Sequence, residues 1–363
     1  MTLNEFHHSE AKAFIDIGGY PIPAYYQDAM AEFRAAQKTA MMDRGFIGKL
    51  RVTGKDRESL LHRLSANEMR HLPVGGGVVN IFTNAKGRVV DVVEMFIEAD
   101  SIFLLTSPGR APILKQWIEK YTFVEDVRCD EVTSQFGVIA LLGEESAALL
   151  QKVFDWNIGD LPAQHARAFV VEGQRVLVQR SGAIAPTPFN LILPAAVMMK
   201  CWEALLAQAV PIGQAAYEMC RIHRGLPLMG KEITDEYNPH EVGLYPFINF
   251  DKGCYIGQEV IARLDTYQKV QRQLAEVKLE MSALDEKLFA ATPAPIYFGE
   301  QLIGQLTSAC FSPGHQSGLG LAVIRKQFAA STEPVQIRWL ERVVMGYLQE
   351  LPFASYDDYY LKT

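Results

Sequence analysis

The chain has 363 residues and a formal charge of −7, a size that accommodates two or three domains with sizeable cores. The negative charge argues against direct nucleic-acid binding, because proteins that bind phosphate backbones are usually basic, at least in one domain. Five scattered cysteines without paired spacing indicate a reducing compartment, and no apolar run is long enough to span a bilayer. Residues 1–10 lack the basic flank and apolar core of a signal peptide. We therefore expect a cytoplasmic protein that binds no membrane.

The first third of the chain predicts a layer of mixed α and β structure. Apolar residues from Tyr26 to Met41 fall near helical spacing, so an amphipathic helix is expected to run to about residue 40. Glycines and alternating apolar residues then favour strands and helices in turn. We expect strands at 46–52, 78–82, 88–97 and 101–106, a helix through residues 60–64, and a second helix from Pro112 to about residue 118.

The same order of elements returns from residue 136 onward. Strands are expected at 136–142, 167–171, 175–180 and 189–193, with helices over 144–154 and 195–207. An order of strand, helix, three strands and helix, used twice, predicts two related α+β layers packed together. A further helix is expected over residues 215–224.

Beyond residue 272 the pattern changes to short strands separated by turns. Strands are expected at 274–279, 296–298, 301–308, 318–323 and 335–339, which is typical of a small β-barrel. We therefore divide the chain into residues 1–135, 136–271 and 272–363. The middle part includes a proline-containing segment at 226–250 and can interleave with the first.

The octapeptide from Lys252 to Glu259, Lys-Gly-Cys-Tyr-Ile-Gly-Gln-Glu, is the most informative stretch of the sequence. Two glycines flank Cys254 and allow a tight turn, and Gly257 begins a short expected helix whose first turn carries partial positive charge. Such surroundings, with Lys252 nearby, are typical of a reactive thiol. The alternative is a packing role, which we expect for the remaining cysteines. These are Cys129, Cys201, Cys220 and Cys310.

Asp91 is the second candidate functional residue. It shares one face of the strand expected at 88–97 with Val89 and Val93, so it is a carboxylate on an apolar face. Such a group must be hydrogen-bonded, paired with a cation, or neutral with a raised pKa. The pattern itself does not distinguish a structural acid from a functional one.

The octapeptide resembles the signature of the YgfZ family, folate-binding proteins that support iron–sulfur enzymes. More widely, residues 18–348 resemble the T-protein of the glycine cleavage system, a tetrahydrofolate-dependent aminomethyltransferase. The resemblance implies duplicated ferredoxin-like layers and a barrel around a folate channel, with tetrahydrofolate or another reduced folate as cofactor. It also implies iron–sulfur client enzymes or cluster-assembly proteins as partners, a supporting role in tRNA modification, and Cys254 as the key residue.

Residues 84–91 resemble the T-protein segment that ends in its catalytic aspartate pair, which implies a catalytic role for Asp91. Val92 stands where the second acid would be. Residues 180–190 match an acidic turn that contacts the pterin in the T-protein, but the acids are missing, and Asn190 replaces only part of their hydrogen bonding. The resemblance adds further residues to the expected cofactor site. They are Arg221, Glu241, Tyr245 and Lys252.

Three functions remain open on this basis. The first is a YgfZ-type accessory protein, favoured by Cys254. The second is a tetrahydrofolate-dependent aminomethyltransferase or demethylase, favoured by Asp91. The third is a binding scaffold without pterin recognition, favoured by the missing acids. The sequence has no Cys-x-x-Cys and no histidine pair at ligand spacing, so a metal site made by this chain alone is not expected.

Overall fold

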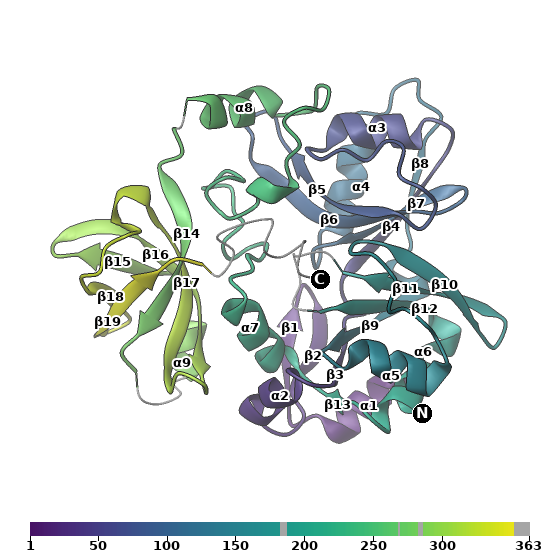
Figure 1. Cartoon of the computed structure of the whole chain (residues 1–363), viewed down its shortest axis with the longest axis horizontal. Coiled ribbons are helices and arrows are strands. Elements are labelled where there is room, and N and C mark those ends of the chain that lie inside the picture. The colour runs from purple at the N-terminus through teal and green to yellow at the C-terminus, as the bar shows by residue number, and fades with distance from the viewer. Residues whose placement is uncertain (182–186, 268, 282–285, 352–363) are drawn as a thin grey trace. The chain divides into compact units, whose positions relative to one another are not determined.

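The computed structural model describes residues 1–181, 187–267, 269–281 and 286–351 (Figure 1). The chain forms two compact units. The first contains Met1–Phe82, Val90–Tyr217 and Asp251–Tyr255, and the second contains Thr83–Val89, Glu218–Phe250 and the chain from Ile256 onward. Among the described helices, none is both long enough and apolar enough to cross a membrane.

A five-stranded sheet forms the first layer of the first unit. Its strand order is β5-β6-β7-β4-β8, and β6 is buried at all nine positions because both faces of the sheet are covered. Unbroken apolar runs favour such doubly covered strands. The strands are β4 (Gly48–Thr53), β5 (Gly77–Thr83), β6 (Val89–Ile97), β7 (Ser101–Thr106) and β8 (Arg128–Glu131), and the helices are α3 (Arg57–Leu64) and α4 (Ala111–Lys120).

A six-stranded sheet forms the second layer, in the order β10-β11-β12-β9-β3-β13. Apart from the inserted β3, it repeats the order of the first sheet, so the predicted duplication is confirmed. Its helices bury an apolar face that includes the fully buried Trp202. The elements are β3 (Ala40–Asp43), β9 (Phe136–Leu142), β10 (Ala166–Val171), β11 (Gln174–Arg180), β12 (Phe189–Pro194), β13 (Val210–Pro211), α5 (Ser146–Phe154) and α6 (Ala195–Leu206).

The N-terminal region differs from the sequence prediction. The expected helix to residue 40 is wrong at its end, because α2 stops at Ala35 and Met41 lies in strand β3. Pairing of β3 with β9 buries Met41 completely, and this tertiary contact outweighs the helical spacing. The elements before β3 are α1 (Leu3–Glu10), the hairpin β1 (Ala13–Ile17) and β2 (Tyr20–Tyr25), and α2 (Ala29–Ala35).

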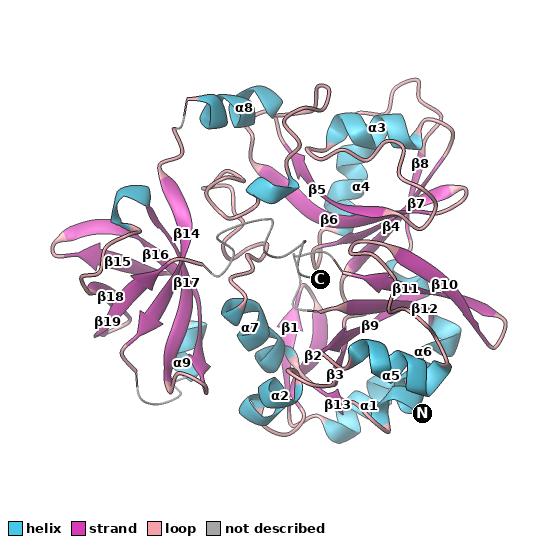
Figure 2. Ribbon diagram, in the orientation of Figure 1, coloured by secondary structure: helices cyan, strands magenta, loops and turns pink. Residues whose placement is uncertain are grey.

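The second unit contains a closed six-stranded barrel, in the order β14-β17-β16-β15-β18-β19 (Figure 2). Trp339 is fully buried in its core and donates its indole N–H to the Ala291 carbonyl at 2.8 Å. The elements are β14 (Arg272–Leu279), β15 (Ala294–Phe298), β16 (Gln301–Ser312), β17 (Ser317–Arg325), β18 (Val335–Trp339), β19 (Arg342–Gln349) and α9 (Glu286–Ala290).

The fold is therefore mixed α+β with a duplicated layer and a β-barrel, as predicted. The chain divisions after residues 135 and 271 stay a prediction. Two further helices connect the layers to the barrel along the chain, α7 (Gln214–His223) and α8 (Gln258–Thr266).

Candidate functional site

The loop that carries Cys254 alternates between buried and exposed side chains. Cys254 is exposed, whereas its neighbours Lys252 and Tyr255 are only 6% and 7% exposed. The Lys252 ammonium donates to the carbonyls of His62 at 2.6 Å, of Asn67 at 3.1 Å, and of Ser65. Burial lowers the pKa of Lys252 to about 8. The lysine thus fastens the loop at the end of helix α3 and leaves the thiol facing solvent.

Helix α8 begins at Gln258, within the octapeptide and one residue after the predicted start at Gly257. Gly257 is its N-cap, with φ of +85° that an L side chain rarely adopts. A Cβ atom there would lie 2.5 Å from the Asn84 carbonyl oxygen, so only glycine fits. The Thr83 hydroxyl donates to the Ile256 carbonyl beside it. The turn between β5 and β6 therefore holds the start of α8.

The other four cysteines are buried, as expected for packing residues. Burial raises the thiol pKa of Cys129 and Cys220 to about 12 and that of Cys201 to about 11, and it also raises the pKa of Cys310. Such thiols stay protonated at neutral pH and are poor nucleophiles. Cys254 is the exposed cysteine of the five.

Asp91 is completely buried in strand β6. Its carboxylate accepts the backbone N–H groups of Val92 at 2.9 Å and of Ser107 at 3.3 Å. Burial raises its pKa to about 6, against the opposing effects of the Ser107 hydrogen bonds and the Arg110 charge. Arg110 in turn donates to the Val90 carbonyl. Asp91 therefore changes its protonation state close to neutral pH, which is the property of a general acid or base.

Ser107 and Arg110 act on the candidate residue Asp91, and the sequence analysis did not identify them. They lie between strand β7 and helix α4, and reach Asp91 because β7 pairs with β6. The sequence signal was weak, since both belong to the short polar connection that ends at the N-terminus of α4.

Asn190 belongs to a second buried polar network, in which Gln179 links it to Glu94. Its amide donates to the Gln179 side-chain oxygen at 3.2 Å, and Gln179 in turn donates to the Glu94 carboxylate. Ser181 also donates to Glu94, at 3.0 Å. Residues 182–186, at the turn without acids, lie outside the described residues. Glu94, an acid of strand β6 that the sequence analysis did not assign to the site, is thus linked to Asn190 through Gln179.

Arg221 forms a buried ion pair with Glu232. Its guanidinium lies 3.1 Å from the Glu232 carboxylate and also donates to Glu218, to the Leu226 carbonyl and to the Ser308 hydroxyl. These contacts engage all five N–H groups of the guanidinium. To bind a folate carboxylate, Arg221 would have to give up one of them.

Glu241 and Tyr245 lie in the segment before the cysteine motif. The Glu241 carboxylate accepts the backbone N–H of Asn238 at 3.1 Å. Tyr245 is 48% exposed, and its ring centroid lies 5.4 Å from His240 and 5.3 Å from Phe250. A half-exposed ring supported by two others can stack on a flat ligand. Arg221, Glu241 and Tyr245 belong to the second unit, whereas Asp91, Asn190, Lys252 and Cys254 belong to the first.

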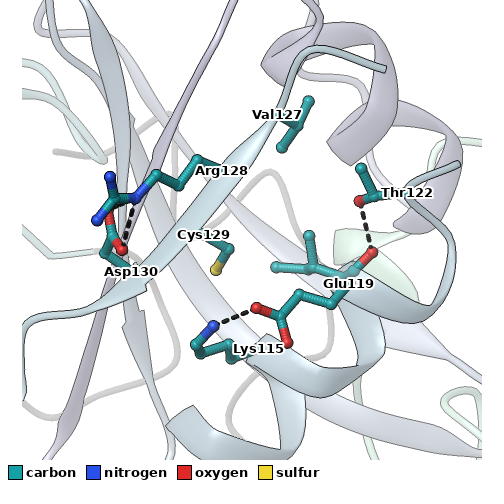
Figure 3. Close-up of a pocket in the computed structure, with 8 residues that line it drawn as sticks. Lys115, Glu119, Thr122, Val127, Arg128, Cys129 and Asp130 are labelled. Carbon is teal, nitrogen blue, oxygen red and sulfur yellow. Dashed lines mark hydrogen bonds and ion pairs between the residues drawn. The ribbon is translucent and has the colours of Figure 1, made fainter. Parts of the chain in front are cut away.

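A pocket of about 400 Å³ lies between helix α4 and strand β8 (Figure 3). Its charged side chains form the ion pairs Lys115–Glu119 and Arg128–Asp130, the second at 2.8 Å. Cys129 lies between the two pairs, and its buried thiol is protonated at neutral pH. Because these charges cancel in pairs, the pocket offers a ligand no net charge.

A duplicated α+β layer that carries a buried aspartate, together with a separate six-stranded barrel, defines a GcvT-like protein. Two family profiles match the chain, namely the GCVT N-terminal domain at residues 3–252 and the glycine cleavage T-protein C-terminal barrel domain at residues 272–354. The chain belongs to the glycine cleavage T-protein superfamily.

Similar proteins agree with this assignment. A chloroplastic protein of Arabidopsis thaliana, provisionally named a transferase, is 30% identical over 87% of this chain and 71% of its own length. The aminomethyltransferase of Chlorobium phaeovibrioides is 27% identical over 98% of both chains. The crystal structure of the glycine cleavage system aminomethyltransferase T from Bartonella henselae superimposes with a TM-score of 0.86 at 19% identity, over 98% of this chain and 97% of its own. This last similarity concerns the fold.

Proposed function

We propose that the protein is a folate-binding accessory protein of the YgfZ type, which supports iron–sulfur enzymes through Cys254. The observation that carries the proposal is the contrast between Cys254 and its neighbour Lys252. The lysine fixes the loop by three carbonyl contacts, and the thiol beside it is exposed while the other four are buried. A role that only required packing would not leave this thiol in solvent.

Tetrahydrofolate, or another reduced folate, is the proposed cofactor. The family supports it, since relatives are named aminomethyltransferases. Within the first unit, Asn190 offers an amide oxygen of the kind that the N–H groups of a pterin require. Within the second unit, Tyr245 remains a proposed cofactor residue because its half-exposed ring can stack on a flat ligand. Glu241 remains a proposed cofactor residue. The contacts of Lys252 and Arg221 favour a positioning role for these two residues.

The proposed partners are iron–sulfur client enzymes or cluster-assembly proteins, and a role in tRNA modification would follow from such clients. A single thiolate provides one ligand, whereas a cluster takes about four, so the client or a small thiol would provide the others. Cys254 would therefore hold an iron or sulfur species only during its transfer.

Complementation of a deletion strain tests the proposal. Cys254→Ser should keep the fold and folate binding but lower the activity of iron–sulfur clients, whereas Cys129→Ser should complement fully. Calorimetry with tetrahydrofolate should give a Kd between about 1 µM and 1 mM for both variants. Full complementation by Cys254→Ser would contradict the proposed role of the thiol. The absence of a heat of binding with tetrahydrofolate would contradict the proposal that the protein binds folate.

A second candidate function is tetrahydrofolate-dependent transfer of an aminomethyl or methyl group. The observation that favours it is the pKa of Asp91, which burial raises to about 6 and which suits proton transfer near neutral pH. The assay supplies an aminomethyl-loaded carrier protein and tetrahydrofolate. Turnover of about 1 per second or faster, abolished by Asp91→Asn, would establish this function. Negligible turnover is expected because Val92 replaces the second acid.

A further inference from the structure

Two arginines of the barrel face each other across neighbouring strands. Strands β14 and β17 are antiparallel, and their register places Arg272 directly opposite Arg325. Directly opposite residues project from the same face of a sheet, so both guanidinium groups lie on one side. Both residues are exposed. Like charges at such positions destabilise a sheet, so we expect a compensating contact, either within the protein or with a ligand.

Neither arginine finds a compensating acid within the part of the chain that the structure describes. No described carboxylate lies within ion-pair distance of either guanidinium. Arg272 instead lies over the ring of Tyr237, with 5.6 Å between the guanidinium carbon and the ring centroid. Tyr237 is buried, and its hydroxyl accepts a hydrogen bond from the Gln305 amide at 2.5 Å. A fixed ring therefore holds the Arg272 guanidinium beside Arg325.

Both arginines line the same groove, whose volume is about 240 Å³. Besides the two cations it contains one acid, Glu236, so its net charge is positive. Gln305 and Tyr237 add neutral polar groups. The remaining wall is apolar and formed by Pro293, Pro295, Leu302, Ile303 and Val323.

We propose that this groove is a binding site for an acidic peptide segment of a partner protein. A side-chain carboxylate of the peptide lies between Arg272 and Arg325, because planar guanidinium groups match carboxylates in bidentate geometry. An adjacent apolar side chain packs against the proline wall. Glu236 accepts a backbone N–H of the peptide, and its negative charge disfavours a compact dianion such as phosphate at the same place. A peptide, which has both donors and carboxylates, fits this mixed lining.

In the free protein, repulsion between the two arginines lowers the stability of the fold. In the complex, the carboxylate of the peptide lies between them and relieves this repulsion. Replacing Arg325 by a neutral residue of similar length removes the repulsion without touching the contact between Arg272 and Tyr237. Arg325→Gln should therefore raise the melting temperature while it weakens peptide binding. A purely structural role of Arg325 predicts the opposite change in stability.

Fluorescence polarisation with the full chain tests the proposal. The probe is fluorescein-labelled Gly-Phe-Asp-Asp-Leu-Gly, and the matched control peptide has Asn-Asn in place of Asp-Asp. The aspartate peptide should bind with a Kd below about 1 mM, and Arg325→Gln or Arg272→Gln should weaken binding by about tenfold or more. Lys278→Gln, which removes an exposed charge from the same strand β14, should change neither binding nor stability.

Three results of the binding measurements and one result of a competition would overturn the proposal. The binding results are no binding of the aspartate peptide by the wild type, equal binding by Arg325→Gln, and equal binding of the asparagine peptide. Inorganic phosphate serves as the competitor. If phosphate displaces the labelled peptide at the same concentration as unlabelled peptide does, the groove is a site for small anions. This result would also overturn the assignment to a peptide.

Discussion

Lys252 and Cys254 are separated by a single glycine, yet the lysine side chain points into the protein and the cysteine lies at the surface. The ammonium group fills a cage of three carbonyl oxygens at the end of helix α3. A Cβ atom on Gly253 would have no neighbour within 4 Å among the described residues, so the chain is open on that side between Lys252 and Cys254. The loop is thus fixed on one side and open on the other.

The first prediction concerns thiol accessibility. In the native wild-type protein we expect Ellman's reagent to modify one thiol per chain rapidly, because four of the five cysteines are buried. The Cys254→Ser variant should show no rapid phase, whereas Cys129→Ser should react like the wild type. The measurement is absorbance of the released thiolate before and after denaturation. Rapid modification of a second thiol would contradict the burial described above.

The second prediction concerns the Lys252 cage. Lys252→Met leaves three carbonyls without their charged donor, and we expect this loss to exceed the desolvation penalty that lowers the pKa of Lys252 to about 8. The free energy of unfolding at pH 7 should therefore fall by about 1–3 kcal/mol in urea titrations, whereas Lys49, treated below, has a single carbonyl contact to lose. Lys278→Met, at an exposed position of β14, should change it by no more than about 0.5 kcal/mol. Equal stability of the two variants would show that the cage contributes nothing.

The third prediction concerns the pH dependence that Asp91 causes. Burial raises its pKa from 3.8 to about 6, so the native state binds the proton more tightly than the unfolded state between these values. Stability from this group is therefore present below pH 4 and lost as the pH rises through 6. Relative to Asp91→Asn, the wild type should lose up to about 3 kcal/mol between pH 4 and pH 7. Urea unfolding of both proteins across this range measures the difference, and a constant difference would contradict the raised pKa.

The fourth prediction concerns Lys49, a fully buried lysine in strand β4. Its ammonium donates to the Gly45 carbonyl at 2.6 Å, and burial lowers its pKa from 10.5 to about 8. Below pH 8 the native state must bury a charge, so this lysine destabilises the fold there, and the penalty disappears as the pH rises from 8 to 10.5. Lys49→Met should therefore raise stability at pH 7 by up to about 3 kcal/mol, and its advantage should shrink at pH 10. Thermal unfolding at both pH values tests this, and an advantage that grows with pH would refute it.

The fifth prediction concerns the buried ion pair between Arg221 and Glu232. Glu232→Gln removes the fully buried one of the two carboxylates that pair with the Arg221 guanidinium and leaves Glu218 as the other. It should therefore cost about 3 kcal/mol, the lower end of the range for a broken buried ion pair. A double-mutant cycle with Arg221→Gln should give a coupling free energy above about 1 kcal/mol. The exposed pair Arg128–Asp130 is the matched control, and its coupling should stay below that value.

Much of the fold could be predicted because many buried strands are short apolar runs bounded by turn residues. The bounds predicted for β7, β9 and β18 coincide with the observed ones, since their apolar residues form short runs between turn signals. Strand β3 was not predicted, since the helix expected to about residue 40 ran up to its first residue, and the charged edge strand β8 and the last barrel strand β19 were not predicted either. In β3 and β8 the pairing partner decides the structure, and this partner is distant in the sequence.

The candidate site also has a part that local sequence predicts and a part that depends on residues distant in the sequence. The exposed cysteine and the helix after it follow from one octapeptide, so local sequence sufficed. Ser107 reaches Asp91 from the connection after strand β7, and only the pairing of β7 with β6 brings the two residues together. Glu94 was visible as an acid within an apolar strand, but its contact with Gln179 depends on the packing of one layer on the other.

The cysteine motif has a consequence for synthesis of the chain. Lys252 binds the carbonyl of His62, which is 190 residues earlier, and Ile256 binds Thr83, which is 173 residues earlier. At translation rates of about 5–20 residues per second, the end of helix α3 and the turn after β5 wait about 10 to 40 s for these partners. Throughout that interval the nascent layer exposes unpaired carbonyls and an unoccupied turn to solvent and to chaperones. A slow-translating codon run placed before residue 252 should therefore lengthen chaperone association without changing the mature protein.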